Sequence, residues 1–236
     1  MAALAVINES TQIADAKIEQ MIPAFTHQWN VDLQSVWGVE TATMTFVPKS
    51  TKPAAGTWWV VFLDNSDQAG ALAYHDLTNE GLPLSKIFVK TILDARESVT
   101  VGASHELVEM AVDPWLNSAY QDPTGTFWAG EVADPVEDDS YAYTINGVLV
   151  TDFVTPNWFA HEYSGATIDF KRHANKAFEV LTGGYAQFFD PQQGWVQVTG
   201  ALAAKSPRAN APTGSRRERR MRSWKNWRVS EVKWRD

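Results

Sequence analysis

The chain has 236 residues, of which 44% are hydrophobic and none is cysteine, and its formal net charge is −8. This composition predicts a folded protein with a substantial core. It excludes disulfides, thiolate metal sites and cysteine nucleophiles, so any metal must be bound by imidazole and oxygen ligands. No apolar run approaches the roughly 20 residues that span a bilayer, and the first residues lack a basic leader region, so we expect neither a membrane span nor a signal peptide.

The first half of the chain predicts one helix followed by several strands. Residues 10–25 carry an approximately helical apolar stripe after a Ser/Thr start. Residues 41–47 and 57–63 are β-branched and aromatic runs separated by Pro and Gly, which is typical of strands. Residues 70–75 predict a third, shorter strand, and residues 87–93 a further one.

The second half predicts one long helix and then hairpins. The helix covers residues 98–112 and ends where Pro114 biases the preceding residue away from helical geometry. Two strand-like runs flank Asn146 and Gly147, a strong hairpin signal, and residues 183–198 predict a second hairpin. Helix, sheet, helix and then an irregular β-rich segment indicate an α+β fold, with a mixed or antiparallel sheet beside the helix at 98–112.

Charge is distributed unevenly along the chain. Residues 206–236 hold ten Lys and Arg against three acidic residues, whereas the residues before them hold ten against 25. We therefore expect a domain at 1–200 and an extended basic arm at 201–236 that binds an acidic partner. The arm also carries Trp224, Trp227 and Trp234, which suit either base stacking or a protein groove. A protein groove is favoured over nucleic acid, because no nucleic-acid-binding fold is recognisable.

The helix at 98–112 carries a pattern typical of metal sites. His105 and Glu109 are four residues apart and share one helix face, so they can bind one ion, while Glu106 lies about 100° round the axis. In the HExxH zinc helix, two histidines bind the metal and the intervening glutamate activates a water. Here Glu109 takes the place of the second histidine. The added carboxylate neutralises more of the ion's charge, so a bound zinc should acidify water less effectively.

Four segments together, residues 105–114, 130–139, 146–154 and 183–191, resemble a family of zincin-like proteins encoded by tailed bacteriophages and prophages. Members of that family are described as metallopeptidases or virion proteins. The likeness covers residues 70–198. It implies a zincin-like domain, with an antiparallel edge strand above the metal helix, and we expect residues 70–75 to be that strand.

The resemblance also implies roles for individual residues. His105 and Glu109 would be the first two metal ligands, and Glu106 would be the general base. The third ligand would come from downstream of the helix: Glu131 is the first choice, and Asp134 and Asp113 are the alternatives. Zinc is the expected ion, although a site with one histidine and several oxygens also suits calcium or manganese.

The remaining histidines and the acidic run predict no chemistry by their pattern. Residues 137–139 are expected in an exposed loop or as the docking site of the basic arm. His27, His161 and His173 are expected either at the surface or with hydrogen-bond partners for their ring nitrogens. His75 is the exception, because on the expected edge strand it would face the cleft.

Two functions follow as hypotheses. The favoured one is a virion-associated structural protein of a capsid or tail, which docks to other virion proteins or to copies of itself through residues 206–236. Its location would be the virion, and the host cytoplasm during assembly. The alternative is an active zinc-dependent metallopeptidase in which Glu106 is the general base and a basic or extended peptide is the substrate.

Overall fold

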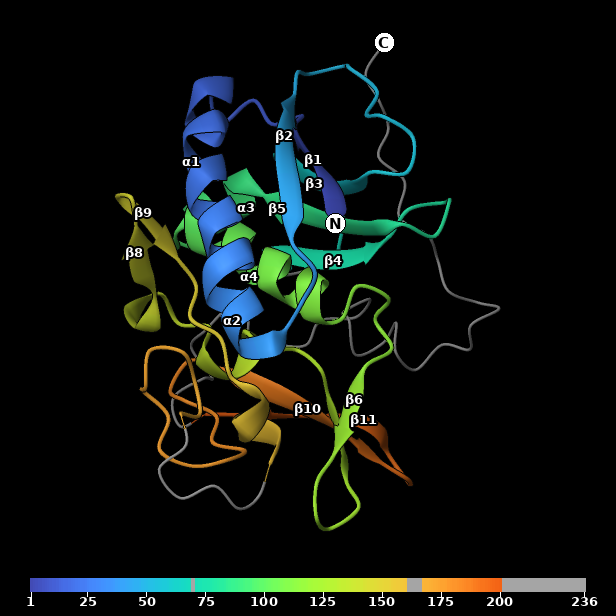
Figure 1. Cartoon of the computed structure of the whole chain (residues 1–236), viewed down its shortest axis with the longest axis vertical. Helices are drawn as coiled ribbons and strands as arrows, with labels where there is room; N and C mark the ends of the chain where they lie inside the picture. Colours follow the sequence, from blue (N-terminus) through green and yellow to red (C-terminus); the bar gives the residue numbers. More distant parts are fainter. Residues whose placement is uncertain (69–70, 161–166, 201–236) are drawn as a thin grey trace.

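The computed structural model describes residues 1–68, 71–160 and 167–200, and these residues have an α+β architecture (Figure 1). The largest sheet has five strands in the order β2-β1-β3-β5-β4. The first four strands in this order are parallel to one another, and β4 pairs antiparallel with β5 at one edge. The strands are β1 (Ala2–Asn8), β2 (Ala42–Val47), β3 (Trp58–Leu63), β4 (Ala73–Leu77) and β5 (Pro83–Phe88).

Strand β1 lies inside the sheet, between β2 and β3, and is buried on both faces. Successive strand residues point to opposite faces, and here Leu4 and Val6 join one apolar cluster while Ala5 and Ile7 join another. The sequence predicted no strand in this segment. A strand buried on both faces is a continuous apolar run without alternation, so its pattern does not mark it as a strand.

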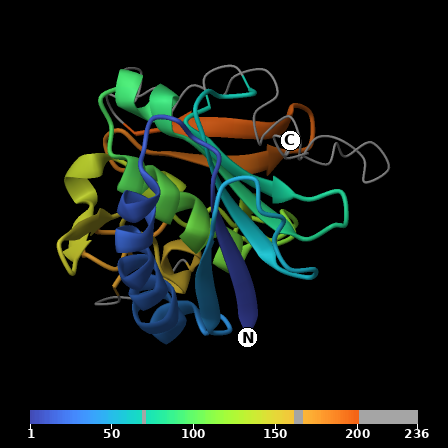
Figure 2. The same ribbon diagram turned by 90° about the horizontal axis from the view of Figure 1, so that it is seen from above.

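Helix α1 (Asp15–His27) and helix α4 (Val99–Val112) pack on the same face of the five-stranded sheet, as Figures 1 and 2 show. The prediction of a helix at 10–25 is confirmed, although α1 begins at Asp15. The chain continues from it through a π-helical turn, η1 (Gln28–Leu33), into α2 (Gln34–Trp37). Helix α2 ends at Gly38, whose φ of 66° is the left-handed conformation that glycine adopts without strain.

Helix α4 occupies the range that the sequence predicted and has an identifiable cap at its start. The Oγ atom of Ser98 accepts the Val101 N–H, and Asp113 leaves the helix just before Pro114. The helix contacts β4 and β5 on one side and β9 (Val148–Val150) on another. This enclosure accounts for the burial of every residue from Val101 to Met110, and helices buried all round are apolar over most of their surface.

The second half of the chain forms a smaller antiparallel sheet, which lies below the five-stranded sheet in Figure 1. Its order is β11-β10-β7-β6, and β8 (Tyr143–Ile145) and β9 form a separate hairpin. Both predicted hairpins are confirmed. The four strands of the smaller sheet are β6 (Ala119–Gln121), β7 (Phe127–Ala129), β10 (Tyr185–Asp190) and β11 (Gly194–Thr199).

The described residues also form three 3₁₀ helices of three or four residues each, namely η2 (Asp134–Val136), η3 (Asp139–Tyr141) and η4 (Pro156–Phe159). Among the described residues, none of the helices combines the length and the apolar character needed to cross a membrane.

The predicted strand at 87–93 is wrong from residue 89 onward. Strand β5 ends at Phe88, and α3 (Val89–Asp94) begins with the next residue. Val89 and Ile92 are three residues apart on α3, and both are buried in the main core. The apolar residues of this run therefore follow the helical period and not the strand period. The predicted edge strand at 70–75 corresponds to β4. Gly70, His161 and the arm at 201–236 lie outside the described residues.

Candidate metal centre

Two side chains of the predicted metal helix meet as the helical spacing requires. The His105 Nε2 atom lies 3.3 Å from the Glu109 Oε1 atom. The same nitrogen lies 3.2 Å from the Asp134 Oδ1 atom, which the first residue of η2 supplies. His105, Glu109 and Asp134 therefore form one group of potential metal ligands, and all three are buried.

Strand β4 brings a second histidine to the same helix. In the β4–β5 register His75 lies opposite Ser85, and the Ser85 Oγ atom faces α4, where it contacts the Glu106 carbonyl and the Met110 sulfur. Residues opposite each other in a sheet share a face, so His75 also points at α4. Its Nδ1 atom lies 3.4 Å from the Glu106 Oε2 atom and 3.7 Å from the Glu109 Oε2 atom.

The other two predicted ligands, Glu131 and Asp113, lie in different places. Glu131, in the segment between β7 and η2, joins a second group with His75 and Glu109. Asp113 belongs to neither of these groups. Its Oδ1 atom accepts the N–H groups of Asn117 and Ser118, at 2.8 and 2.9 Å, and so closes the turn that follows α4.

Glycines close to Asp134 fix the path of the chain there. A Cβ atom on Gly184 would lie 2.5 Å from the Pro135 carbonyl oxygen and 2.8 Å from that of Asp134. A Cβ atom on Gly183 would lie 2.6 Å from an Asp138 carboxylate oxygen. The Gly-Gly pair of the predicted second hairpin therefore lets β10 approach the segment that carries Asp134.

The centre concentrates negative charge away from water. Glu106, Glu109, Glu131 and Asp134 are each at most 3% exposed. Burial lowers the pKa of His105, but Glu109 and Asp134 raise it by more, so this pKa lies well above its usual range. Several buried carboxylates at one place are costly unless cations compensate them, and the centre therefore favours bound positive charge.

The spacing of the ligand atoms fits a shared ion. The contacts of His105 with Glu109 and Asp134 measure 3.3 and 3.2 Å, which is longer than the roughly 2.7–2.9 Å of a charge-assisted hydrogen bond. Metal–ligand distances of about 2.0–2.2 Å place two ligands of a tetrahedral zinc about 3.4 Å apart. The residues present therefore suit a divalent cation by donor type and by spacing.

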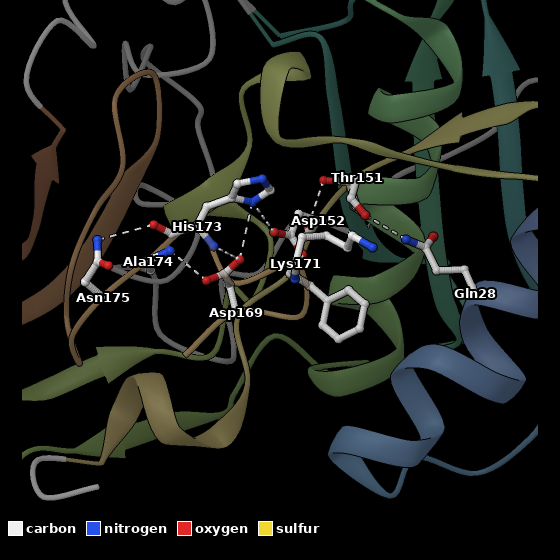
Figure 3. A network of polar contacts seen from close by, with 9 residues as sticks. Gln28, Thr151, Asp152, Asp169, Lys171, His173, Ala174 and Asn175 are labelled. Carbon is white, nitrogen blue, oxygen red and sulfur yellow. Dashed lines mark hydrogen bonds and ion pairs between the residues drawn. The ribbon is translucent and has the colours of Figure 1, made fainter. Parts of the chain in front are cut away.

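A third group of potential ligands, Asp152, Asp169 and His173, has a different character (Figure 3). The His173 Nδ1 atom lies 3.0 Å from the Asp152 Oδ2 atom and 3.4 Å from the Asp169 Oδ2 atom. Three of the four carboxylate oxygens accept backbone N–H groups of the same loops. Because these oxygens already accept hydrogen bonds from the backbone, we interpret the group as a structural clasp, that is, a set of contacts that holds the loops together.

No sequence pattern predicted this group of Asp152, Asp169 and His173. His173 was expected to be a surface or satisfied histidine, and its ring does contact acceptors, but Asp152 and Asp169 were not recognised. The contact between His173 and Asp152 joins residues 21 positions apart in irregular loops. No helical or strand period relates such positions, so only the folded chain brings them together.

The acidic run at 137–139 is more integrated than predicted. Glu137 is 1% exposed, so it does not lie in an exposed loop. The Asp139 Oδ2 atom accepts the Ser98 N–H at 2.8 Å, and the Asp138 Oδ1 atom accepts the Ser140 N–H at 2.9 Å. A carboxylate near the first turn of α4 is stabilising there, because a helix N-terminus carries partial positive charge.

Comparison of the chain with protein-family models, with curated proteins and with solved structures found no match.

Proposed function

We propose that this chain is a zincin-like metal-binding protein that serves as a structural component of a bacteriophage virion. The observation that carries the metal-binding part is the buried group of His105, Glu109 and Asp134. Zinc is the proposed ion, since an imidazole and carboxylates at this spacing are among its usual ligands.

Two features of the fold support the zincin-like assignment. The helix with the His-Glu-x-x-Glu pattern packs directly against strands β4 and β5. Strand β4 is the antiparallel edge of an otherwise parallel sheet, which is the arrangement that the resemblance implies for the strand above the metal helix.

Burial of the centre favours a structural role for the ion. His75, Glu109 and Asp134 are each 0% exposed, and His105 is 4% exposed. Structural metal sites are closed by protein ligands, whereas catalytic sites keep a position open for water or substrate. With the side chains enclosed in this way, an ion held here would mainly tie α4 to the segment that carries Asp134.

The virion role rests on the resemblance and on the composition of the basic arm. A segment such as 206–236, with ten Lys and Arg and three tryptophans, suits an acidic protein surface. The proposed partners are other virion proteins or further copies of this chain, in the virion and, during assembly, in the host cytoplasm. Sedimentation of the full chain beside a variant with Trp224, Trp227 and Trp234 replaced by Ala tests self-association, and equal sedimentation would argue against it.

A metallopeptidase is the second candidate, and the position of Glu106 favours it. This carboxylate is not in the group around His105, and it lies instead 3.4 Å from the His75 Nδ1 atom. A divalent ion in the centre would act as a Lewis acid on a peptide carbonyl. Glu106 would take a proton from the attacking water, and the edge strand β4 would align an extended peptide.

Metal content and cleavage, measured on the same samples, test both candidates. Elemental mass spectrometry of zinc-loaded protein should find bound zinc in wild type and in His27→Gln, a control at a half-exposed histidine. The His105→Gln variant should bind less zinc than wild type. Wild type without bound zinc would contradict the proposal.

The Glu106→Gln variant separates the two roles. It should retain zinc under the structural proposal, and neither it nor wild type should cleave a mixture of unstructured peptides. Cleavage by wild type that disappears in Glu106→Gln, with zinc retained, would establish the peptidase instead.

A further inference from the structure

We propose that the centre binds two divalent cations and that Glu109 bridges them, with His75 from the edge strand as a ligand of the second ion. This inference rests on the proposed metal-binding function and extends it from one ion to a pair. Neither the helix motif nor the resemblance calls for a second ion or for His75 as a ligand.

The two oxygens of Glu109 face different histidines. The Oε1 atom lies 3.3 Å from the His105 Nε2 atom, and the Oε2 atom lies 3.7 Å from the His75 Nδ1 atom. The Ala133 N–H donates to Oε1 at 3.3 Å and helps to orient the carboxylate. A carboxylate placed between two imidazoles in this way has the geometry of a bridging ligand.

Each histidine has its own terminal carboxylate in addition to the shared one. One group is His105, Glu109 and Asp134, and the other is His75, Glu109 and Glu131; within each group the potential ligand atoms lie within 4.8 Å of one another. Each ion would thus have one imidazole, one terminal carboxylate and one oxygen of Glu109. The ligands come from α4, β4 and the β7–η2 segment, so three parts of the chain hold the pair.

The charge of the centre also matches two ions better than one. Glu106 lies 3.4 Å from His75 and is the fourth buried carboxylate. Four carboxylates with two neutral imidazoles carry a formal charge of about −4, which two divalent cations neutralise. A single divalent cation would leave about two negative charges buried, and uncompensated buried charge is costly.

The donor set narrows the chemical class of the ions. Imidazole nitrogen suits zinc and other first-row transition metals, and carboxylates suit manganese as well. Calcium takes six to eight oxygen ligands, which a group with one imidazole and two carboxylates does not provide. We therefore assign the pair to zinc or manganese class ions, and zinc is the probe for the test.

The first experiment counts zinc ions per chain in full-length protein after loading and gel filtration. Wild type should bind two. The His75→Gln and Glu131→Gln variants should bind one, and His105→Gln should also bind one. The Glu109→Gln variant should lose or weaken both ions, because it removes the shared ligand. The His27→Gln variant is the matched control and should bind two.

The outcomes distinguish this inference from the function on which it rests. One ion in wild type that persists in His75→Gln and disappears in His105→Gln would overturn the pair and leave the metal-binding proposal intact. No ion in wild type would overturn both.

A second measurement needs only wild type, in case a variant fails to fold. X-ray absorption of the zinc-loaded protein should contain a zinc–zinc vector of about 3.5–4 Å, the separation typical of two-metal sites. Zinc neighbours limited to nitrogen, oxygen and carbon would overturn the bridged pair.

Discussion

The clasp of Asp152, Asp169 and His173 predicts a specific dependence of stability on pH. Burial of Asp152, together with the neighbouring Asp169, raises the Asp152 pKa from its usual value of 3.8 to about 9. Between these two values the unfolded chain has released the proton while the folded chain retains it. The native state then binds more protons than the unfolded state, so the free energy of unfolding falls as pH rises through this window.

The magnitude follows from one proton. A difference of one bound proton changes the free energy of unfolding by at most about 1.4 kcal/mol per pH unit. From about pH 5 to about pH 8 the contribution of Asp152 should therefore fall by as much as ~4 kcal/mol. Protonation of the facing His173 would stabilise an ionised Asp152 and reduce this figure.

The Asp152→Asn variant removes the pH-dependent contribution of Asp152 to stability. An asparagine carbonyl can still accept the N–H groups of Phe153 and Lys171, as the Asp152 Oδ1 atom does, but it has no proton to release. In urea unfolding with a chelator present, the free energy of unfolding of the variant should increase relative to that of wild type with each pH unit. Asp190→Asn is the matched control, because the Asp190 Oδ1 atom also accepts two backbone N–H groups but in an exposed turn. A stability difference between Asp152→Asn and wild type that does not change with pH would refute the reasoning.

Two further substitutions test the packing. Gly184→Ala places a Cβ atom 2.5 Å from the Pro135 carbonyl oxygen, so it should cost about 1–3 kcal/mol in urea unfolding and weaken zinc binding. Gly56→Ala, whose Cβ atom would meet nothing within 4 Å, should leave zinc binding unchanged, and equal zinc affinity in the two variants would contradict the steric argument. Leu4→Ala in the buried centre of β1 should cost about 2–5 kcal/mol. The half-exposed Leu93→Ala should cost far less, and similar losses in both would show that β1 is not central to the core.

Local chemistry made α4 and the meeting of its His105 and Glu109 side chains predictable. Ser98 and Pro114 mark the ends of the helix, and the spacing of His105 and Glu109 brings them together in any regular helix. The Asn146–Gly147 hairpin was equally predictable, since both residues adopt the positive φ values that its tight turn requires.

Other features depend on the whole fold and were missed or only suggested. The burial of β1 on both faces leaves no alternation to read, and residues 87–93 are too few to distinguish a strand period from a helical one. His75 was expected to face the cleft, but its meeting with Glu109 depends on the β4–β5 register, which pairs residues that no local pattern relates.

The enclosure of α4 has a consequence for how ions would enter and leave the centre. Because the potential ligands are at most 4% exposed, a cation could not exchange through the native structure as it stands. Exchange would have to wait for transient opening of the protein around α4, so the barrier to local unfolding would control its rate. Loading would then be most rapid while the newly made chain is still folding, and an ion acquired at that stage would be kinetically trapped for as long as the domain stays closed.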